Sequence, residues 1–283
     1  MRARRRIPEG LKWVAPALVV LLALSIYPLM YSIKVSFTGA SGAFTLAHFA
    51  RLFGDHIFAA AALQTAVLTL AAMGIEFVSG LILALLVDSL ARGRGFFRAG
   101  FLIPMITPPV VAAVAWRLIY NPQFGLLNGM LRQIRVDTSR LTWTNGGNSA
   151  LLSVILVDVW EWTPFLFLLL SAGLQAIPAD PIEAARIDGA SAFHIFRDIT
   201  LPLLKPVIVL ALLLRAMDLV RIFDQIFILT QGGPGTATET VSLYIYRTAF
   251  RFTNFGYAAA MSFVLLAATM LFSRALMRSM RVR

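Results

Sequence analysis

Long apolar segments alternate with short polar ones along the chain. Six of the apolar segments are long enough to cross a bilayer, because a helix that rises 1.5 Å per residue needs roughly 20 residues to span about 30 Å of hydrocarbon. This pattern predicts an all-α, polytopic membrane protein with six transmembrane helices. The expected helices cover residues 13–37, 59–87, 101–120, 150–176, 206–230 and 256–273.

The composition agrees with a membrane protein. Of the 283 residues, 59% are hydrophobic and 14% are charged, and the mean hydropathy is +0.78, which leaves too few polar side chains to cover a soluble globule. The net charge of +11 comes from Lys and Arg clustered beside apolar segments, so it orients membrane helices and does not indicate nucleic-acid binding. The chain has no cysteine and no H-E-x-x-H sequence, which excludes thiol chemistry and gives no sign of a metal site or of catalysis.

The distribution of positive charge predicts the orientation of the helices. Lys and Arg concentrate on the side that holds 2–12, 92–98, 186–205 and 274–283, and because cytoplasmic loops are the basic ones, both termini are expected in the cytoplasm. The first apolar segment is expected to be a retained helix, since no small-residue cleavage site follows it closely. The expected organisation is a cytoplasmic N-terminus over 1–12, one transmembrane domain over 13–276 with an inner loop at 177–205, and a cytoplasmic tail over 277–283.

Small residues and prolines within the apolar segments predict close packing and bends. Gly74 and Gly80 lie in the second segment, where small residues let helices approach each other. Prolines in the third and fourth segments remove backbone donors, which is tolerated only against protein or a watery cavity. The bends that they predict fit a bundle around a pathway and equally fit irregular packing. These prolines are Pro104, Pro108, Pro109 and Pro164.

The inner loop between the fourth and fifth apolar segments has the pattern of two short helices joined by a bend. Asp180 is expected to cap the first helix, with Pro181 at its first position and Glu183 completing a capping box. Gly189 suits the turn out of that helix, and Ser191 is expected to cap the second. A plain connection needs only a few residues, so the length of the loop favours contact with a partner. A loop that merely ties two spans together is the alternative.

The same loop resembles the signature of binding-protein-dependent ABC importer permeases. That signature is E-A-A, three residues, G, nine residues, I, one residue and L-P. Segments 157–178, 223–250 and 255–266 resemble the carbohydrate-uptake branch, specifically the maltose and glycerol-phosphate transporter type of first permease subunit. The residues that match the signature are Glu183, Ala184, Ala185, Gly189, Ile199, Leu201 and Pro202.

The resemblance implies a type I importer fold in the plasma (inner) membrane of a prokaryote. It also implies a second homologous permease, two ATPase subunits and an extracytoplasmic solute-binding protein as partners. The chain has no G-x-x-x-x-G-K-[ST] sequence, so ATP and Mg are expected on the partner ATPase and no cofactor on this chain. By the resemblance, the first short helix of the loop docks into a cleft of the ATPase. The residues implied in this coupling are Glu183, Ala184, Ala185, Asp188, Gly189, Ala190, Ile199, Leu201 and Pro202.

The fourth and fifth apolar segments carry ionisable side chains, which cost roughly 2.5 to 3.5 kcal/mol each at a helix centre and therefore usually face the bundle interior. Asp218, Arg221 and Gln225 are spaced to share one helix face. Carboxylates, an amide and a guanidinium exchange hydrogen bonds with sugar hydroxyls, and aromatic rings offer a flat surface to the C–H face of a sugar. The candidate substrate pathway comprises Asp158, Glu161, Trp162, Phe165, Asp218, Arg221, Asp224 and Gln225.

These polar groups also have structural alternatives. Asp218 can pair with Arg221 or Arg215 and brace the bundle, and the two carboxylates of the fourth segment can lie at an outer end that water reaches. The tryptophans of that segment can belong to an interfacial aromatic belt. Glu76, near the middle of the second segment, favours a helix-to-helix hydrogen bond over a ligand contact.

The leading interpretation is a non-catalytic permease subunit that moves a sugar, as a di- or oligosaccharide, or a related polyol by alternating access. A stand-alone secondary transporter is the alternative, for which inverted repeats and a central ion site would be expected. A membrane-embedded enzyme would need carboxylates or a metal motif at the membrane surface. Asp180, Asp188 and Asp198 are present, but capping, bending and solvation explain them. The sequence does not identify the sugar.

Overall fold

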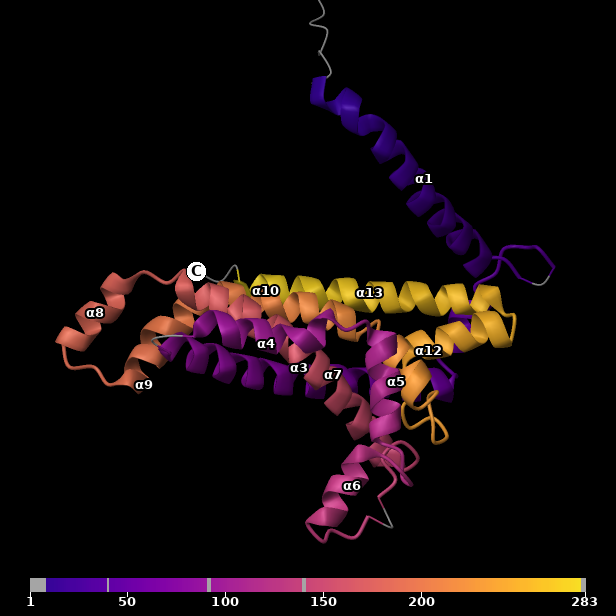
Figure 1. The fold of residues 1–283 in the computed structure, drawn as a ribbon. Coiled ribbons are helices and arrows are strands. Elements are labelled where there is room, and N and C mark those ends of the chain that lie inside the picture. The colour runs from indigo at the N-terminus through magenta and orange to yellow at the C-terminus, as the bar shows by residue number, and fades with distance from the viewer. Residues whose placement is uncertain (1–8, 40, 91–92, 139–140, 281–283) are drawn as a thin grey trace, which may run out of the picture. The chain divides into compact units, whose positions relative to one another are not determined.

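The computed structural model describes residues 9–39, 41–90, 93–138 and 141–280. The expected N-terminal segment up to residue 8, Arg92, Arg140 and the last three residues of the expected tail lie outside the described residues. Within the described ranges the regular elements are helices, with one isolated bridge between Thr38 and Phe44. Figure 1 shows the helices α1 (Glu9–Ser36), α2 (Ala47–Leu52), α3 (His56–Ser89), α4 (Arg94–Ile106), α5 (Pro109–Ile119), α6 (Leu126–Gln133), α7 (Gly147–Gln175), α8 (Ala179–Ile187), α9 (Ala192–Ile195), η1 (Phe196–Thr200), α10 (Leu201–Leu219), α11 (Asp224–Leu229), α12 (Val241–Tyr246), η2 (Arg247–Arg251) and α13 (Phe255–Met280).

Five stretches of helix among the described residues are long and apolar enough to cross a membrane. They are most of α1, α3, α7, the continuous run from α9 through α10, and most of α13. The helix expected over 101–120 is instead two helices, α4 and α5, that meet at an angle of 89°. Thr107 between them is extended, with φ −71° and ψ 127°, because the residue before a proline avoids the helical region. The pair makes a sixth span only if it is counted as one broken crossing.

The fifth span also differs from its expected limits of 206–230. Helix begins at Ala192, passes through the π turn η1 and ends at Leu219. The π turn ends at Thr200, two residues before Pro202. Its wider backbone accommodates a proline, which has no backbone N–H to donate to the helix. After Leu219 the chain makes a turn, and α11 begins at Asp224. The turn contains Arg221 beside Val220, Ile222 and Phe223, and these apolar residues extend the expected segment past the end of the helix.

The inner loop confirms two of its predicted local features and corrects others. Gly189 turns out of α8 with φ +81°, and the Ser191 hydroxyl accepts a hydrogen bond from the backbone N of His194 at 3.4 Å. The start of α8 lies earlier than expected, at Ala179, so Asp180 and Pro181 are its second and third residues. Asp180 does not cap it, and no side chain closes a capping box there. The second helix is not separate but runs on into α10.

The chain divides into two compact units, one formed by residues up to Asp55 with Ile245–Val264 and the other by His56–Tyr244 with the residues from Leu265 onward. In the first unit the Tyr257 hydroxyl donates to the Asp55 carboxylate at 2.5 Å. The Arg51 guanidinium lies 4.2 Å from the centre of the Tyr257 ring. These contacts fix the short α2 region to the first turn of α13.

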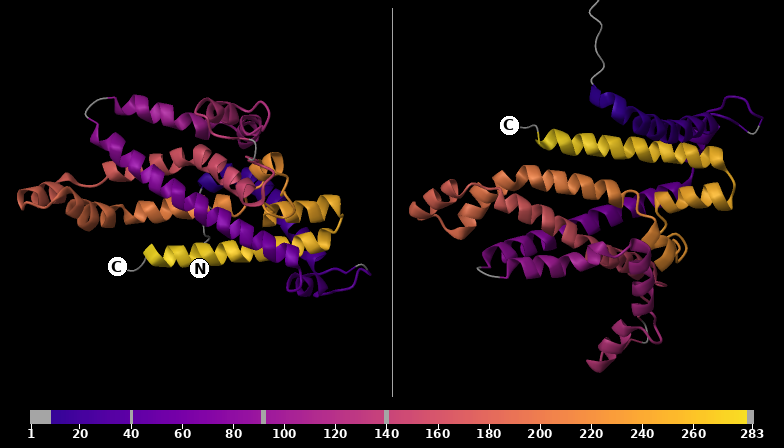
Figure 2. Two further views of the ribbon diagram at one scale, coloured as in Figure 1. Left: turned by 90° about the horizontal axis from the view of Figure 1, so that it is seen from below. Right: turned by 45° about the horizontal axis from the view of Figure 1, so that its top comes forward.

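In the second unit α3, α7 and α10 pack against one another, and Figure 2 shows them from two further directions. Gly80 of α3 permits this packing, because an added Cβ would lie 3.0 Å from the backbone N of Phe167 and 3.1 Å from Cβ of Leu166. Gly74 has open space where its Cβ would be, so it does not bring two of the described helices of this chain together. Phe167 belongs to a buried apolar cluster with Ala84, Val87, Leu170 and Leu204.

Candidate functional site

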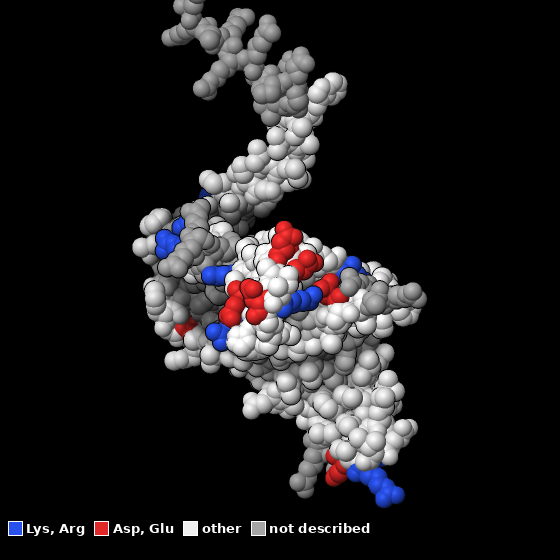
Figure 3. Space-filling model, turned by 90° about the vertical axis from the view of Figure 1, so that its left-hand side faces the viewer, with Lys and Arg blue, Asp and Glu red and all other residues white. Residues whose placement is uncertain are grey.

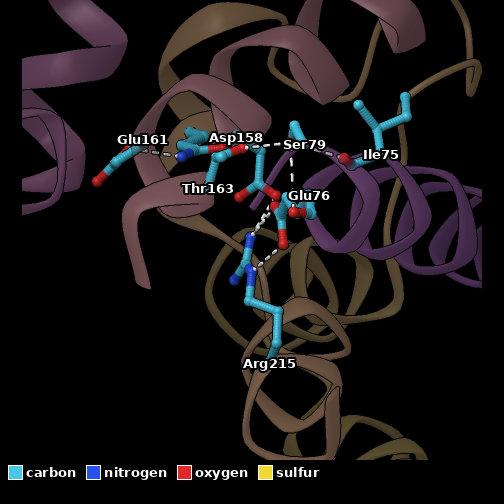
Figure 4. Close-up of polar contacts among 8 residues, drawn as sticks. Ile75, Glu76, Ser79, Asp158, Glu161, Thr163 and Arg215 are labelled. Carbon is cyan, nitrogen blue, oxygen red and sulfur yellow. Dashed lines mark hydrogen bonds and ion pairs between the residues drawn. The ribbon is translucent and has the colours of Figure 1, made fainter. Parts of the chain in front are cut away.

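A buried ionic cluster joins the three packed helices of the second unit. Nε of Arg215 on α10 donates to Oε2 of Glu76 on α3 at 2.7 Å, and its Nη2 donates to Oε1 of the same carboxylate at 2.9 Å. Nη2 also donates to the carboxylate of Asp158 on α7. Figure 4 shows the three side chains meeting from their separate helices, and each is at most 2% exposed. Charges buried in this way are tolerated only when they are paired and hydrogen-bonded.

A second polar contact lies one helical turn further along α7. Nε2 of Gln225 on α11 donates to Oε2 of Glu161 at 2.7 Å, and both residues are buried. The remaining side-chain oxygens of this pair, Oε1 of Glu161 and Oε1 of Gln225, have no hydrogen-bond partner in the described part of the chain. Buried acceptors of this kind are uncommon and call for an explanation.

Next to both contacts is a cavity of about 280 Å³. Arg215 forms part of its wall, and the Arg215 guanidinium carbon lies 5.0 Å from the centre of the Trp162 ring, which also faces the cavity. Pro109, Ile222 and Phe223 contribute apolar surface. Six of the predicted pathway residues complete the wall, namely Asp158, Trp162, Asp218, Arg221, Asp224 and Gln225.

The two other predicted pathway residues, Glu161 and Phe165, do not line this cavity. Glu161 is fully buried and reaches the cavity only through Gln225. Phe165 packs against Trp162, with ring centres 6.2 Å apart and planes at 79°. The interpretation that Asp158 and Glu161 lie at a solvated outer end is wrong, because they are 1% and 0% exposed. The expected helix-to-helix role of Glu76 is confirmed.

Asp218 and Arg221 form the pair that their spacing predicts. Nη2 of Arg221 donates to Oδ1 of Asp218 at 3.0 Å, and Nε donates to the carbonyl oxygen of Met217 at 2.9 Å. The prediction that Gln225 shares their helix face is wrong, because the helix ends at Leu219 and Gln225 belongs to α11. All three nevertheless line one cavity, since the turn after Leu219 brings α11 to the same wall.

The loop that begins with α8 presents a polar surface. None of the α8 residues is buried, and Figure 3, which faces the end of the molecule that carries α8 and α9, shows acidic side chains gathered there among a few basic ones. At the end of α8 the backbone N of Ala190 donates to the carbonyl oxygen of Ala185 at 2.9 Å. Ile199 lies in η1, and Leu201 and Pro202 begin α10, so the signature residues extend from this surface into a spanning helix.

Residues 76–282 match the family described as the binding-protein-dependent transport system inner membrane component. The chain belongs to this family. The match includes α8, the cavity wall and every member of the ionic cluster, so both parts of the candidate site lie within the shared region of this permease family.

Individual relatives agree with the family match. The chain is 40% identical to the trehalose/maltose transport system permease protein MalF of Thermococcus litoralis over 258 residues, which cover 89% of this chain and 85% of that protein. It is 36% identical to the trehalose transport system permease protein SugA of Mycobacterium tuberculosis over 267 residues, 92% of this chain and 84% of that one.

A solved structure shares the fold. A chain of a bacterial alginate ABC transporter, crystallised in complex with an alginate pentasaccharide-bound periplasmic protein, superimposes with a TM-score of 0.83. The superposition covers 98% of each chain at 22% sequence identity. At that identity the likeness concerns the fold alone, and it confirms the expected type I ABC importer permease architecture.

Sequence reasoning missed the central residue of this permease site. The sequence offers Arg215 only one ion-pair partner, Asp218, which is three residues away on the same helix. Its true partners come from α3 and α7, and Glu76 is 139 residues distant. A basic residue in the middle of a spanning segment, together with single acidic residues in two other segments, is the signal that points to such a cluster.

Proposed function

We propose that this chain is a transmembrane permease subunit that moves a sugar, as a di- or oligosaccharide, or a related polyol into a prokaryotic cell. It works in an ATP-driven importer with a second homologous permease, two ATPase subunits and an extracytoplasmic solute-binding protein. Membership in the binding-protein-dependent family and the names of the relatives from Thermococcus and Mycobacterium support this proposal.

The observation that carries the proposal is the cavity between α7, α10 and α11. Its wall combines a tryptophan ring with carboxylate, amide and guanidinium groups, which is a set of groups suited to a polyhydroxylated ligand. The neighbouring ionic cluster joins three spanning helices, so the part of the wall formed by Asp158 and Arg215 is held in place by helix packing. In the importer the second permease would supply the opposite wall, and the pathway would open alternately to the two sides.

The energy for transport enters through α8. This helix is short, has no buried residue and ends at a glycine with positive φ, as expected of an element that fits into a cleft of another protein. Ala184, Ala185 and Gly189 leave room for that surface, and Glu183 and Asp188 meet its polar or basic groups. Because α9 continues through η1 into α10, movement of α8 would be passed directly to the helix that carries Arg215.

The proposed orientation places α8 and both termini in the cytoplasm, with the chain in the inner membrane. The basic residues that flank the spanning segments support this orientation. The cavity-bearing end of α10 then lies toward the outer side, where the solute-binding protein delivers its ligand.

The proposal is tested by reconstituting the complete importer in proteoliposomes and measuring uptake of labelled maltose and trehalose. Uptake is expected to require ATP on the ATPase side and solute-binding protein on the opposite side, and the loaded binding protein is expected to stimulate ATP hydrolysis. Uptake by this chain alone, driven by an ion gradient, would support a secondary transporter instead. Failure of every sugar and polyol to stimulate ATP hydrolysis would contradict the proposed substrate class.

A further inference from the structure

The cavity wall carries more carboxylates than guanidiniums, and both guanidiniums are already paired with carboxylates of the chain. Three carboxylates, those of Asp158, Asp218 and Asp224, face two guanidiniums, those of Arg215 and Arg221. This wall therefore does not offer the surplus of positive charge with which proteins hold carboxylates and phosphates.

Both guanidiniums are already paired within the chain. Arg215 is shared between two carboxylates, those of Glu76 and Asp158, at a site where the side chains are nearly completely buried. Arg221 is paired with Asp218 at 3.0 Å and also donates to a backbone carbonyl. An anionic ligand would therefore share a guanidinium with a carboxylate that is already bound to it, and it would lie close to that negative charge.

The cavity wall instead carries hydrogen-bond acceptors that have no partner among the described residues. In the described part of the chain the Asp224 carboxylate, at the start of α11, takes part in no hydrogen bond or ion pair. Oε1 of Gln225 has no hydrogen-bond partner either, although the residue is only 2% exposed. Of these two unpartnered acceptors, the Asp224 carboxylate is exposed and fits a ligand that brings hydrogen-bond donors.

We infer that this subunit's part of the pathway selects neutral, hydroxyl-rich carbohydrates and rejects anionic ones such as uronates and sugar phosphates, with Asp224 as the specificity-determining residue. This inference rests on the proposed function, since it concerns the ligand class of the same cavity. Sugar hydroxyls donate to Asp224, while the flat C–H face of the sugar lies against Trp162. A carboxylate or phosphate on the ligand would be repelled by Asp224 and would find no unpaired guanidinium.

The test uses the complete importer in lipid nanodiscs without the solute-binding protein, so that the selectivity of that protein does not enter. Saturation-transfer NMR measures weak binding of three probes with one skeleton: trehalose, its 6-amino derivative and its monouronate. Trehalose and the amine are expected to bind, and the uronate about tenfold more weakly, as expected for one like-charge contact at a partly solvated site. In Asp224→Asn the difference between trehalose and the uronate is expected to shrink to about threefold or less.

Asp198→Asn is the matched control, because Asp198 is an exposed carboxylate on η1 that does not line the cavity. It should leave the preference for trehalose over the uronate unchanged. Equal binding of trehalose and uronate to the unaltered complex, or a preference that stays at full size in Asp224→Asn, overturns the inference and leaves the proposed sugar transport standing. Absence of signal from all three probes, combined with absence of sugar uptake, contradicts the proposed function and this inference together.

Discussion

Arg215 on α10 and Glu76 on α3 share two hydrogen bonds, of 2.7 and 2.9 Å, at a point where both side chains are at most 2% exposed. Asp158 on α7 completes the cluster. Spanning helices have no hydrophobic drive to associate within lipid, so contacts of this kind help to decide which helices pack together. The cluster also sets one wall of the proposed substrate pathway, which links the stability of the bundle to its transport function.

Replacing Arg215 is expected to destabilise the permease strongly. Arg215→Met leaves two buried carboxylates without a partner, and breaking a buried pair in this way typically costs about 3–5 kcal/mol. The measurement is the thermal midpoint of the purified complex together with its yield from the membrane. A combined variant, Arg215→Met with Glu76→Gln and Asp158→Asn, removes all three charges and is expected to recover much of the loss.

Arg221→Met provides the comparison for that experiment. Arg221 is 63% exposed and its partner Asp218 is 47% exposed, and exposed pairs contribute only about 0–1 kcal/mol. Its thermal midpoint should therefore stay close to that of the unaltered complex. If Arg215→Met were as stable as Arg221→Met, the cluster would have no structural role.

Two glycines of α3 are expected to respond in opposite ways to the same substitution. Gly80→Ala places a Cβ against the backbone of α7 at 3.0 Å, and overpacking of this kind costs about 1–3 kcal/mol. Gly74→Ala meets nothing within 4 Å and is expected to stabilise the helix by roughly 0.5–1 kcal/mol. Thermal midpoints of the two variants test the prediction, and equal effects would show that α3 and α7 do not approach at Gly80.

Trp162 is expected to support sugar transport while the nearby Trp160 does not. Trp162 faces the cavity, and loss of an aromatic surface typically removes about 0.5–1.5 kcal/mol, which corresponds to a loss of up to about tenfold. Trp162→Leu should lower sugar uptake by that factor at subsaturating concentrations. The Trp160 ring is partly exposed and packs against Trp116, so Trp160→Leu should transport normally. Normal uptake by Trp162→Leu would exclude its ring from the pathway.

Hydropathy and local turn chemistry predicted much of this permease. The positions of the long apolar helices follow from segment length, and Gly189 and Ser191 follow from the backbone conformations that they favour. The corner at Thr107 was visible only as a group of prolines, because a proline predicts a bend without predicting its angle. The end of α10 at Leu219 coincides with charged residues, namely Asp218, Arg221 and Asp224, which helical spacing assigns to a continuing helix.

The candidate site was predicted as a set of residues but not as an arrangement. Helical spacing identified the pair of Asp218 and Arg221, which is a local relationship. The partners of Arg215 depend on how three helices pack, and a single sequence does not contain that information. The same limit explains why helical spacing places Gln225 on the wrong helix face, although it lines the cavity together with Asp218 and Arg221.

Gly189 is expected to be essential for coupling. Its φ of +81° disfavours other residues, and nothing lies within 4 Å of its Cβ position, so Gly189→Asp tests the approach of a partner more than packing within the chain. The variant should insert normally, lose uptake and hydrolyse ATP without regard to substrate. Gly42→Asp is the control, because Gly42 also has positive φ and open space but lies far along the chain from α8. Full uptake in Gly189→Asp would contradict the coupling role of this turn.

Contact between α8 and the ATPase is the central claim, and cysteine crosslinking tests it most directly. The chain contains no cysteine, so Ala185→Cys introduces a single thiol on α8 that can be paired with single cysteines along the proposed cleft of the ATPase. A crosslink is expected in the assembled importer, with a yield that changes when ATP is bound, and none is expected from Asn145→Cys, which the proposed orientation places on the opposite side of the membrane. Labelling of residue 185 by an impermeant thiol reagent from outside the cell, with no crosslink to the ATPase, would contradict this claim.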